Sequence, residues 1–255
     1  MLKDYKKNGF FKIKSFLDKS DKKVLLNASY LTFKKFISIR KFSSFENQNL
    51  HNKLIFFRRT NPKKFGVMYD MLNLNASIRS IFFQKKFQKI FSKLLNVPKE
   101  QIFLNGFMFR LDAPNDKRNI LGWHQDSAYY EMTYPKYNAG VCWISLTNNS
   151  VKNGILQFVT ASHKKGYIKT KLTKKSKLSS EQFQIRLNKN EKSSYLISKF
   201  GDASFFHMNI KHKSGFNSSE RIRFTLGCRF HDMSKGFNTG KELYIYNKSS
   251  RSQLY

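Results

Sequence analysis

The chain has 255 residues, enough for one large β domain with its own core, and a content of 40% hydrophobic and 16% aromatic residues excludes a disordered protein. Its 48 lysines and arginines against 16 aspartates and glutamates give a formal net charge of +32. No uncharged apolar run reaches the roughly 18 residues of a membrane span, and the first eleven residues lack the apolar stretch of a signal peptide, so we expect a cytoplasmic protein with no membrane span.

The positive charge has two interpretations. It fits a nucleic-acid or anionic-membrane partner, or it reflects a composition rich in lysine, asparagine, phenylalanine and isoleucine, as A- and T-biased codons produce. The lysines are spread along the whole chain and form no single block, which favours the second interpretation. In either case the field of the protein attracts small anionic molecules such as carboxylates, phosphates or acyl-CoA.

The first hundred residues predict a helical support with one short strand. The Asn8-Gly9 turn opens a strand within residues 8–17, and Asp18 or Ser20 can cap a helix through residues 23–26. Residues 32–70 give no clear pattern. A helix begins at Asn75, carries apolar residues at helical spacing, and ends at Asn96-Val97-Pro98.

From residue 101 onward the pattern changes to short strands separated by turns. They are expected at residues 102–111, 120–126, 137–146, 154–159, 194–200, 203–208 and 221–230. Strands of this length and spacing indicate a double-sheet jelly roll or barrel. We therefore expect a single domain, mainly β with flanking helices. Residues 1–100 would support a core at 101–231, and residues 232–255 would form a C-terminal tail.

Residues 164–193 are rich in lysine and serine and interrupt the strands, either as an active-site loop or as a surface insertion. Cys142 and Cys228 both lie in apolar runs, and two cysteines make no disulfide framework. We expect buried, reduced thiols, which suits a reducing cytoplasm.

The stretch Trp123-His124-Gln125-Asp126 carries the strongest chemical signal. On a strand, residues two apart point to the same side, so His124 and Asp126 can face one site. Imidazole and carboxylate suit Fe(II), and two histidines with one carboxylate form the ligand set of non-haem iron oxygenases. A His-x-Asp pair alone often arises by chance, so a third ligand decides the interpretation.

Besides His124, the chain has five histidines that are candidates for that third ligand. His51 precedes the strands, His163 lies at a turn, and His231 ends the last strand. His212 opens a turn-rich segment beside a strand and is favoured, whereas His207 lies inside Phe205-Phe206-His207-Met208 and is expected to be structural or to act next to the ligands.

Arg223 lies eleven positions after His212 on the next predicted strand. Its planar guanidinium could bind a co-substrate carboxylate through two hydrogen bonds, and Ser214 offers a hydroxyl nearby. Alternation places Arg221, Arg223 and Thr225 on one face of the strand, so Arg221 competes for the same role.

Several linked motifs, in order, resemble the phytanoyl-CoA dioxygenase family of Fe(II)/2-oxoglutarate-dependent oxygenases. The resemblance covers nearly the whole chain and rests on Asn8-Gly9-Phe10-Phe11, Trp123-His124-Gln125-Asp126, Gly140-Val141-Cys142-Trp143, Asn153-Gly154-Ile155-Leu156, Gly201-Asp202-Ala203, His212-Lys213-Ser214-Gly215 and Arg221-Ile222-Arg223. One departure is Lys213, where the family usually has a glycine.

The resemblance implies a double-stranded β-helix in which His124, Asp126 and His212 bind iron. It implies that Arg223 and Ser214 bind 2-oxoglutarate, and that Trp143 lines the co-substrate pocket. The implied reaction uses Fe(II), 2-oxoglutarate and O2, with ascorbate in support, and hydroxylates a C–H bond of a small anionic substrate while releasing succinate and CO2. Related halogenases replace the carboxylate ligand with a small residue, so Asp126 favours hydroxylation.

Two other functions remain open. A nucleic-acid dealkylating oxygenase would share the metal chemistry, and Arg223 and Arg229 match the Arg-x5-Arg spacing of that class, although its first arginine lies further from the distal histidine. A non-catalytic β-helix protein that binds an anion is the second alternative. Tyr129, Tyr130 and Tyr134 follow the metal motif and either line the substrate entrance or pack at the rim of the barrel.

Overall fold

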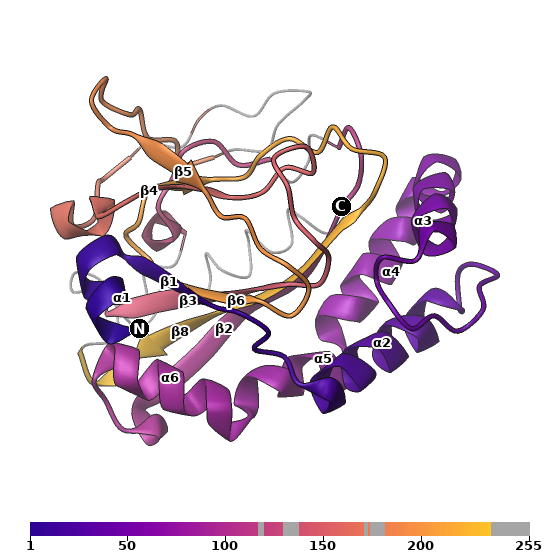
Figure 1. Ribbon diagram of the computed structural model, residues 1–255, viewed down its shortest axis with the longest axis horizontal. Helices are drawn as coiled ribbons and strands as arrows, with labels where there is room; N and C mark the ends of the chain where they lie inside the picture. The colour runs from indigo at the N-terminus through magenta and orange to yellow at the C-terminus, as the bar shows by residue number, and fades with distance from the viewer. Residues whose placement is uncertain (117–119, 130–137, 171–172, 174–181, 236–255) are drawn as a thin grey trace.

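Two antiparallel sheets and a layer of helices make up the computed structural model, which describes residues 1–116, 120–129, 138–170, 173 and 182–235 (Figure 1). The helices are α1 (Leu2–Asn8), α2 (Lys19–Phe33), α3 (Gln48–Thr60), α4 (Pro62–Leu74), α5 (Ala76–Ser80) and α6 (Lys85–Leu95). The strands are β1 (Phe10–Ile13), β2 (Ile102–Asp112), β3 (Ala139–Ser145), β4 (Gln157–Val159), β5 (Ser193–Tyr195), β6 (Ala203–His207), β7 (His212–Lys213) and β8 (Arg223–Asp232).

The larger sheet has the strand order β1-β6-β3-β8-β2, and the smaller one has the order β5-β4-β7. The long strand β8 lies between β2 and β3, with Thr225 opposite both Arg110 and Ser145. The N-terminal segment adds β1 to the edge of the large sheet, so residues 1–100 contribute a strand to the core as well as the supporting helices. This arrangement is the jelly-roll architecture that the strand spacing predicts.

One face of the large sheet packs against the helices. Alternate residues of β8 and of its neighbours supply this apolar face, including Phe224, Leu226 and Phe230. Figure 1 shows α2, α5 and α6 running along this side of the sheet. The helices fix the sheet from behind and leave its other face for the site.

The other face of the large sheet looks toward the small sheet. Val141, Trp143 and Phe206 from the large sheet pack there against Leu156 and Phe158. The alternate residues of β8 that face this side are Arg223, Thr225, Gly227, Arg229 and His231, and all of them are buried. Polar residues concentrated on the inner face of a buried strand indicate a site between the two sheets.

Three helix starts follow local sequence signals. Asp18 caps α2 by accepting a hydrogen bond from the backbone N–H of Asp21 at 3.0 Å, and Asn47 and Asn75 cap α3 and α5 in the same way. The region 32–70, which has no clear pattern in the sequence, contains α3 and most of α4. Their solvent-facing sides also carry apolar residues, Phe56, Val67 and Met71, and this obscures the helical pattern.

The long helix expected from Asn75 is instead three pieces, α5, the 3-10 turn η1 (Ile81–Phe83) and α6. Gln84 is extended, with ψ near 148°, and separates the last two pieces. Phe82 and Phe87 are both buried but are five residues apart, so one continuous helix could not place both on the sheet. The break at Gln84 turns α6 so that Phe87, like Phe82, is buried in the core.

The strand expected at residues 120–126 is also wrong. Only His124 makes a strand-like bridge, to His212, before the 3-10 turn η3 (Asp126–Ala128). The neighbouring backbone pairs irregularly: Gly122 donates to the side chain of Gln182, and Trp123 accepts from the backbone of Ile185. The strands expected at 154–159 and 194–200 are shorter than predicted, at three residues each.

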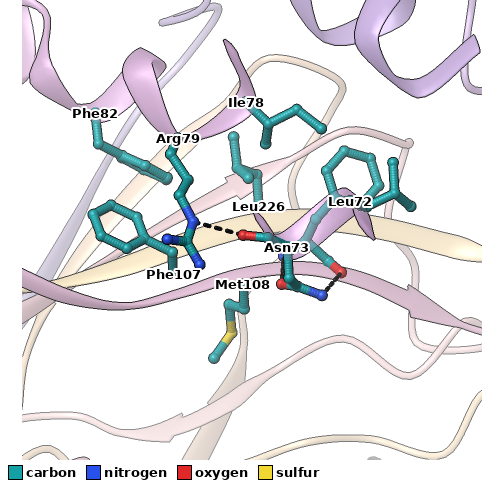
Figure 2. Close-up of a pocket in the computed structure, with 9 residues that line it drawn as sticks. Leu72, Asn73, Ile78, Arg79, Phe82, Phe107, Met108 and Leu226 are labelled. Atoms are coloured by element: carbon teal, nitrogen blue, oxygen red, sulfur yellow. Dashed lines mark hydrogen bonds between the residues drawn. The ribbon is translucent and has the colours of Figure 1, made fainter. Parts of the chain in front are cut away.

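A narrow crevice lies behind the sheet, between α4, α5 and β2 (Figure 2). Asn73 joins α4 to β2, because its side chain accepts from the backbone N–H of Phe109 at 2.7 Å. It also joins α4 to α5, because its backbone carbonyl accepts from Arg79 Nε at 2.6 Å. The crevice is mostly apolar and too narrow for a ligand. Among the described residues, no helix is long and apolar enough to cross a membrane.

Candidate metal centre

His124, Asp126 and His212 converge between the two sheets. One ligand atom from each side chain lies within 4.8 Å of the others, and all three residues are buried. Asp126 Oδ1 is 3.4 Å from the Nε2 atoms of both histidines. The convergence has a backbone cause: His124 and His212 form an antiparallel bridge, exchanging two hydrogen bonds of 2.9 and 3.0 Å.

The two histidines are held in the same orientation. His124 Nδ1 lies 2.7 Å from the carbonyl of Gly122, and His212 Nδ1 lies 3.0 Å from the carbonyl of Ile210. A carbonyl can only accept, so each Nδ1 carries the proton and each Nε2 presents its lone pair. Both lone pairs point toward Asp126, which is the donor arrangement that a divalent transition metal needs.

The charges around the centre favour metal-binding protonation states. Burial lowers the pKa of His124, and neighbouring His212 lowers it further. Burial alone would raise the pKa of Asp126, but Arg229 and the two histidines more than offset this effect and hold it well below its ordinary value. A neutral imidazole and an ionised carboxylate are the forms that ligate a metal.

Arg229 binds the oxygen of Asp126 that faces away from the histidines. Its Nε and Nη2 atoms lie 3.0 and 2.9 Å from Asp126 Oδ2. The same guanidinium donates through Nη1 to the carbonyl of Gly106 at 2.9 Å. The sequence offered Arg229 only as half of an Arg-x5-Arg spacing, and its contact with a candidate metal ligand was not foreseen.

Gln125, between the two ligands of the His-x-Asp pair, is fully buried and anchors the chain that follows β4. Its amide donates to the carbonyl oxygens of Gly166 and Asn209 and accepts from the backbone N–H of Ile168. The described parts of the 164–193 segment therefore lie against the loop that carries the ligands.

Tyr129 connects the same segment to the ligands. Its ring packs edge-on against His124 at 5.7 Å, and its hydroxyl accepts from the backbone N–H of Phe183 at 3.0 Å. Tyr129 thus lies beside the candidate metal centre, and its place at the substrate entrance stays a prediction. Tyr130 and Tyr134, the other two tyrosines of that prediction, lie outside the described residues.

Arg223 is buried at the start of β8 and pairs with Asp112 on the adjacent strand. Its Nη2 and Nε atoms lie 2.6 and 3.2 Å from Asp112 Oδ2, while Arg110 binds the other oxygen of the same carboxylate at 2.9 Å. Burial alone would raise the pKa of Asp112, but the two arginines bring it to about 2. Neither Arg110 nor Asp112 was predicted from the sequence.

Arg221 does not share this environment. It precedes β8, its side chain is 47% exposed, and it contacts Glu46 and Gln48 on the surface. The alternation that placed it on the inner face fails because regular pairing of β8 begins only at Arg223.

Trp143 and Ser214, the other predicted site residues, are both buried. Trp143 packs between the sheets with the guanidinium of Arg110 5.4 Å above its ring, and it lies opposite Gly227. Ser214 is buried two residues after His212, and Lys213 turns away to pack over Trp123 at 5.0 Å. The Lys213 substitution in the motif therefore leaves the His212 position intact.

Thr225 is marked by a buried hydroxyl and not by charge. Its hydroxyl is fully buried, and no group in the described part of the chain forms a hydrogen bond with it. It lies between Arg223 and Gly227 on the inner face of β8. The alternation of β8 could have suggested this residue, but only the structure shows that its hydroxyl has no partner.

Among the described residues, the group that could hold a metal includes neither His207 nor the two cysteines. His207 accepts from the backbone N–H of Asn209 and packs near His163 and Tyr5, which agrees with a structural role. Cys142 and Cys228 lie directly opposite each other on β3 and β8 as free, buried thiols, as predicted.

Comparison with known proteins gives one family and a set of similar folds. Residues 5–225 match the family described as phytanoyl-CoA dioxygenase (PhyH). No curated protein sequence is a significant match.

Three solved structures illustrate the similar folds. EvdO2 from Micromonospora carbonacea var. aurantiaca aligns with a TM-score of 0.61 at 14% identity, over 91% of this chain and 89% of that one. The non-haem monooxygenase ThoJ gives 0.60 at 13% identity, over 99% and 96%. The non-haem α-ketoglutarate-dependent epimerase SnoN of nogalamycin biosynthesis gives 0.59 at 15% identity, over 91% and 79%.

Proposed function

Because the chain belongs to the phytanoyl-CoA dioxygenase family and is thus a 2-oxoglutarate-dependent non-haem iron oxygenase, we propose that it hydroxylates an unactivated C–H bond of a small anionic molecule, releasing succinate and CO2. The observation that carries the proposal is the convergence of His124, Asp126 and His212 with both Nε2 lone pairs facing one carboxylate oxygen.

The donor set fits Fe(II). Two neutral imidazoles and one carboxylate form a facial ligand set that leaves coordination positions for a co-substrate and O2. When bound there, the iron would supply the oxidation of the co-substrate and substrate, and the protein would supply ligation, orientation and exclusion of water. Two of the similar folds are known with such groups bound: SnoN in complex with Fe3+ and α-ketoglutarate, and EvdO2 complexed with 2-oxoglutarate.

The inner face of β8 suits 2-oxoglutarate. From one end it presents Arg223, Thr225, Gly227 and Arg229, and Arg229 contacts the metal ligand Asp126. A dicarboxylate lying along this face would have its distal carboxylate at Arg223 and its 2-oxo acid end at the metal.

Four further features suit the same co-substrate. The unpartnered Thr225 hydroxyl can donate to the distal carboxylate, and Ser214 offers a second hydroxyl. Gly227 presents no side chain opposite Trp143, where an added Cβ would lie 3.3 Å from the indole ring. Trp143 would thus form a wall of the pocket. Asp112 would hold Arg223 and Arg110 in place before the co-substrate enters.

Two arguments support hydroxylation of a small anion. Asp126 occupies the position that related halogenases replace with a small residue, so a carboxylate ligand favours transfer of hydroxyl. The net charge of +32 raises the local concentration of anionic substrates near the protein. Tyr129, which packs on the ligand His124, would contact the substrate beside the metal.

The test is succinate formation from 2-oxoglutarate with Fe(II), O2 and ascorbate, first without a substrate and then across a panel of carboxylates, phosphates and acyl-CoA thioesters. We expect slow succinate release that the right substrate accelerates, and its loss in Asp126→Ala, because the variant lacks one of three metal ligands. Equal turnover by the variant and the intact chain would refute the proposal. The same assay on alkylated DNA tests the dealkylating alternative.

A further inference from the structure

We propose that Arg229 is a positioning residue of the metal centre, which holds the Asp126 carboxylate so that only Oδ1 can reach the metal. The inference rests on the proposed function, but it concerns a residue that neither the motif nor the ligand set requires. It also gives Arg229 a role that needs no nucleic-acid substrate.

The two oxygens of Asp126 have different surroundings. Oδ1 lies 3.4 Å from the Nε2 atom of each histidine. Oδ2 accepts from Nε and Nη2 of Arg229 at 3.0 and 2.9 Å. Two donors of one planar guanidinium converge on a single oxygen, which fixes the rotation of the carboxylate as well as its place.

Arg229 is itself held by a distortion of the neighbouring strand. The register between β2 and β8 shifts between Asn105 and Met108, which marks a β-bulge. Gly106 lies in the bulge with φ of 55°, a conformation that glycine adopts without strain. The bulge directs the Gly106 carbonyl to Arg229 Nη1 at 2.9 Å, and the sulfur of Met108 lies 3.8 Å from the same atom.

The consequence is a carboxylate that binds the metal through one oxygen. A carboxylate that turned to bind through both oxygens would take a position that the co-substrate or O2 needs. Gly106 thus allows the bulge, the bulge positions Arg229, and Arg229 orients Asp126. Groups that orient metal ligands in this way commonly change metal affinity or activity by 10- to 100-fold when removed, an order of magnitude taken from well-studied metal sites.

Co(II) binding to the full-length protein tests the inference without any need for turnover. Calorimetry gives the affinity, and the absorption bands of bound Co(II) report its coordination. For Arg229→Gln we expect about 10- to 100-fold weaker binding and altered bands, because Oδ2 is released. For Arg229→Lys we also expect altered bands, since an ammonium keeps the charge but lacks the planar fork.

Arg223→Gln is the matched control, because Arg223 is a buried arginine on the same face of β8 that also binds an aspartate. Asp112 is not a metal ligand, so this variant should keep the Co(II) affinity and bands of the unchanged protein. If Arg229→Gln does not fold, as judged by circular dichroism, Arg229→Lys decides the question alone.

The outcomes separate the two proposals. Absence of Co(II) binding by the unchanged protein would contradict the proposed function. Binding by the unchanged protein with the same affinity and bands in the Arg229 variants would overturn this inference and leave the proposed function standing.

Discussion

At the scale of single residues, the hydroxyl of Thr225 tests the co-substrate assignment most directly. A buried hydroxyl with no partner costs about 1–3 kcal/mol, a cost that a bound carboxylate would remove. We predict that Thr225→Val weakens 2-oxoglutarate binding about tenfold, the value of one hydrogen bond to a charged group, without reducing the free energy of unfolding. Titration calorimetry on the Co(II)-loaded protein measures the affinity.

Thr225→Ser keeps the hydroxyl and is the control for that experiment. It should bind 2-oxoglutarate almost as well as the unchanged protein. An unchanged affinity in Thr225→Val would mean that the hydroxyl faces no ligand, and would remove Thr225 from the proposed pocket.

Arg223, at the start of β8, and Arg221, just before it, give a second prediction. Arg223→Ala should raise the KM for 2-oxoglutarate at least tenfold and leave iron affinity nearly unchanged, because a charged hydrogen bond of about 1.5–3 kcal/mol is lost at the distal carboxylate. Arg221→Ala should change neither quantity, since Arg221 pairs with Glu46 on the surface. Initial rates of succinate release at varied 2-oxoglutarate decide this, and the reverse pattern would reassign the carboxylate to Arg221.

Some residues of the site could be predicted from the sequence, and others could not, for a physical reason. His124 and Asp126 are two positions apart, so a local rule places them together, and His212 follows from the turn-rich segment around it. The contacts of Arg229 with Asp126 and of Arg223 with Asp112 join positions more than 100 residues apart. They depend on strand register, which one sequence does not encode in any local pattern.

At the scale of elements, one buried histidine joins the helical layer to the sheet and makes stability depend on pH. His51 of α3 accepts a hydrogen bond from the backbone N–H of Ile222 at 3.1 Å, just before β8. Burial, assisted by Arg221, lowers the pKa of His51 to about 4 from an ordinary value of 6.5. The folded state therefore resists protonation that the unfolded chain accepts.

The sign of the effect follows from linkage. The contribution of His51 is fully present above pH 6.5 and is lost as the pH falls from 6.5 to about 4. We predict that His51→Asn, whose amide oxygen can accept the same bond, flattens the fall of the unfolding free energy over that range. Urea titrations at several pH values measure the free energy of unfolding. If it falls equally with pH in His51→Asn and in the unchanged protein, His51 is not the group responsible.

The segments that flank the small sheet approach each other more closely than side chains allow. Gly154 has φ of 77°, and a Cβ added to it would lie 2.5 Å from the carbonyl oxygen of Gly215, three residues after His212. We predict that Gly154→Ala destabilises the protein by about 2–3 kcal/mol through backbone strain and collision. Gly66→Ala in α4 is the control, because nothing lies within 4 Å of an added Cβ and alanine favours helix.

Thermal unfolding measures both glycine variants, and we expect their melting temperatures to shift in opposite directions. Gly154→Ala should melt lower than the unchanged protein, and Gly66→Ala should melt slightly higher. A neutral Gly154→Ala would show that the two segments can separate without cost.

The elements themselves were predicted unevenly. The strands β3, β6 and β8 stand out because apolar runs fully buried on both faces are bounded by turn residues. The break at Gln84 and the irregular segment before His124 were missed, because tertiary contacts decide them. Gln84 donates to Asp21, and Gly122 donates to Gln182, across 63 and 60 positions. Local propensity carries no information on such contacts.

At the scale of the whole molecule, the net charge of +32 is too large for ion pairs within the fold to neutralise. The 48 cationic side chains outnumber the 16 acidic ones threefold, so most cations have no carboxylate to pair with. Several of the pairs that do form, such as Arg229–Asp126 and Arg223–Asp112, are buried and weakly screened by salt. Repulsion among the surface cations is therefore the larger salt-dependent contribution to the free energy of unfolding.

This balance predicts that salt stabilises the protein. Raising the ionic strength from about 0.01 M to 0.15 M shortens the screening length from about 30 Å to about 8 Å and weakens repulsion across the surface. The Tm should rise with NaCl, and each 1 kcal/mol gained would appear as about 2–4 °C. Sodium chloride and potassium chloride should act alike, because the effect is screening rather than specific binding. A Tm that falls with salt would mean that surface ion pairs, rather than net repulsion, dominate the electrostatic free energy of this fold.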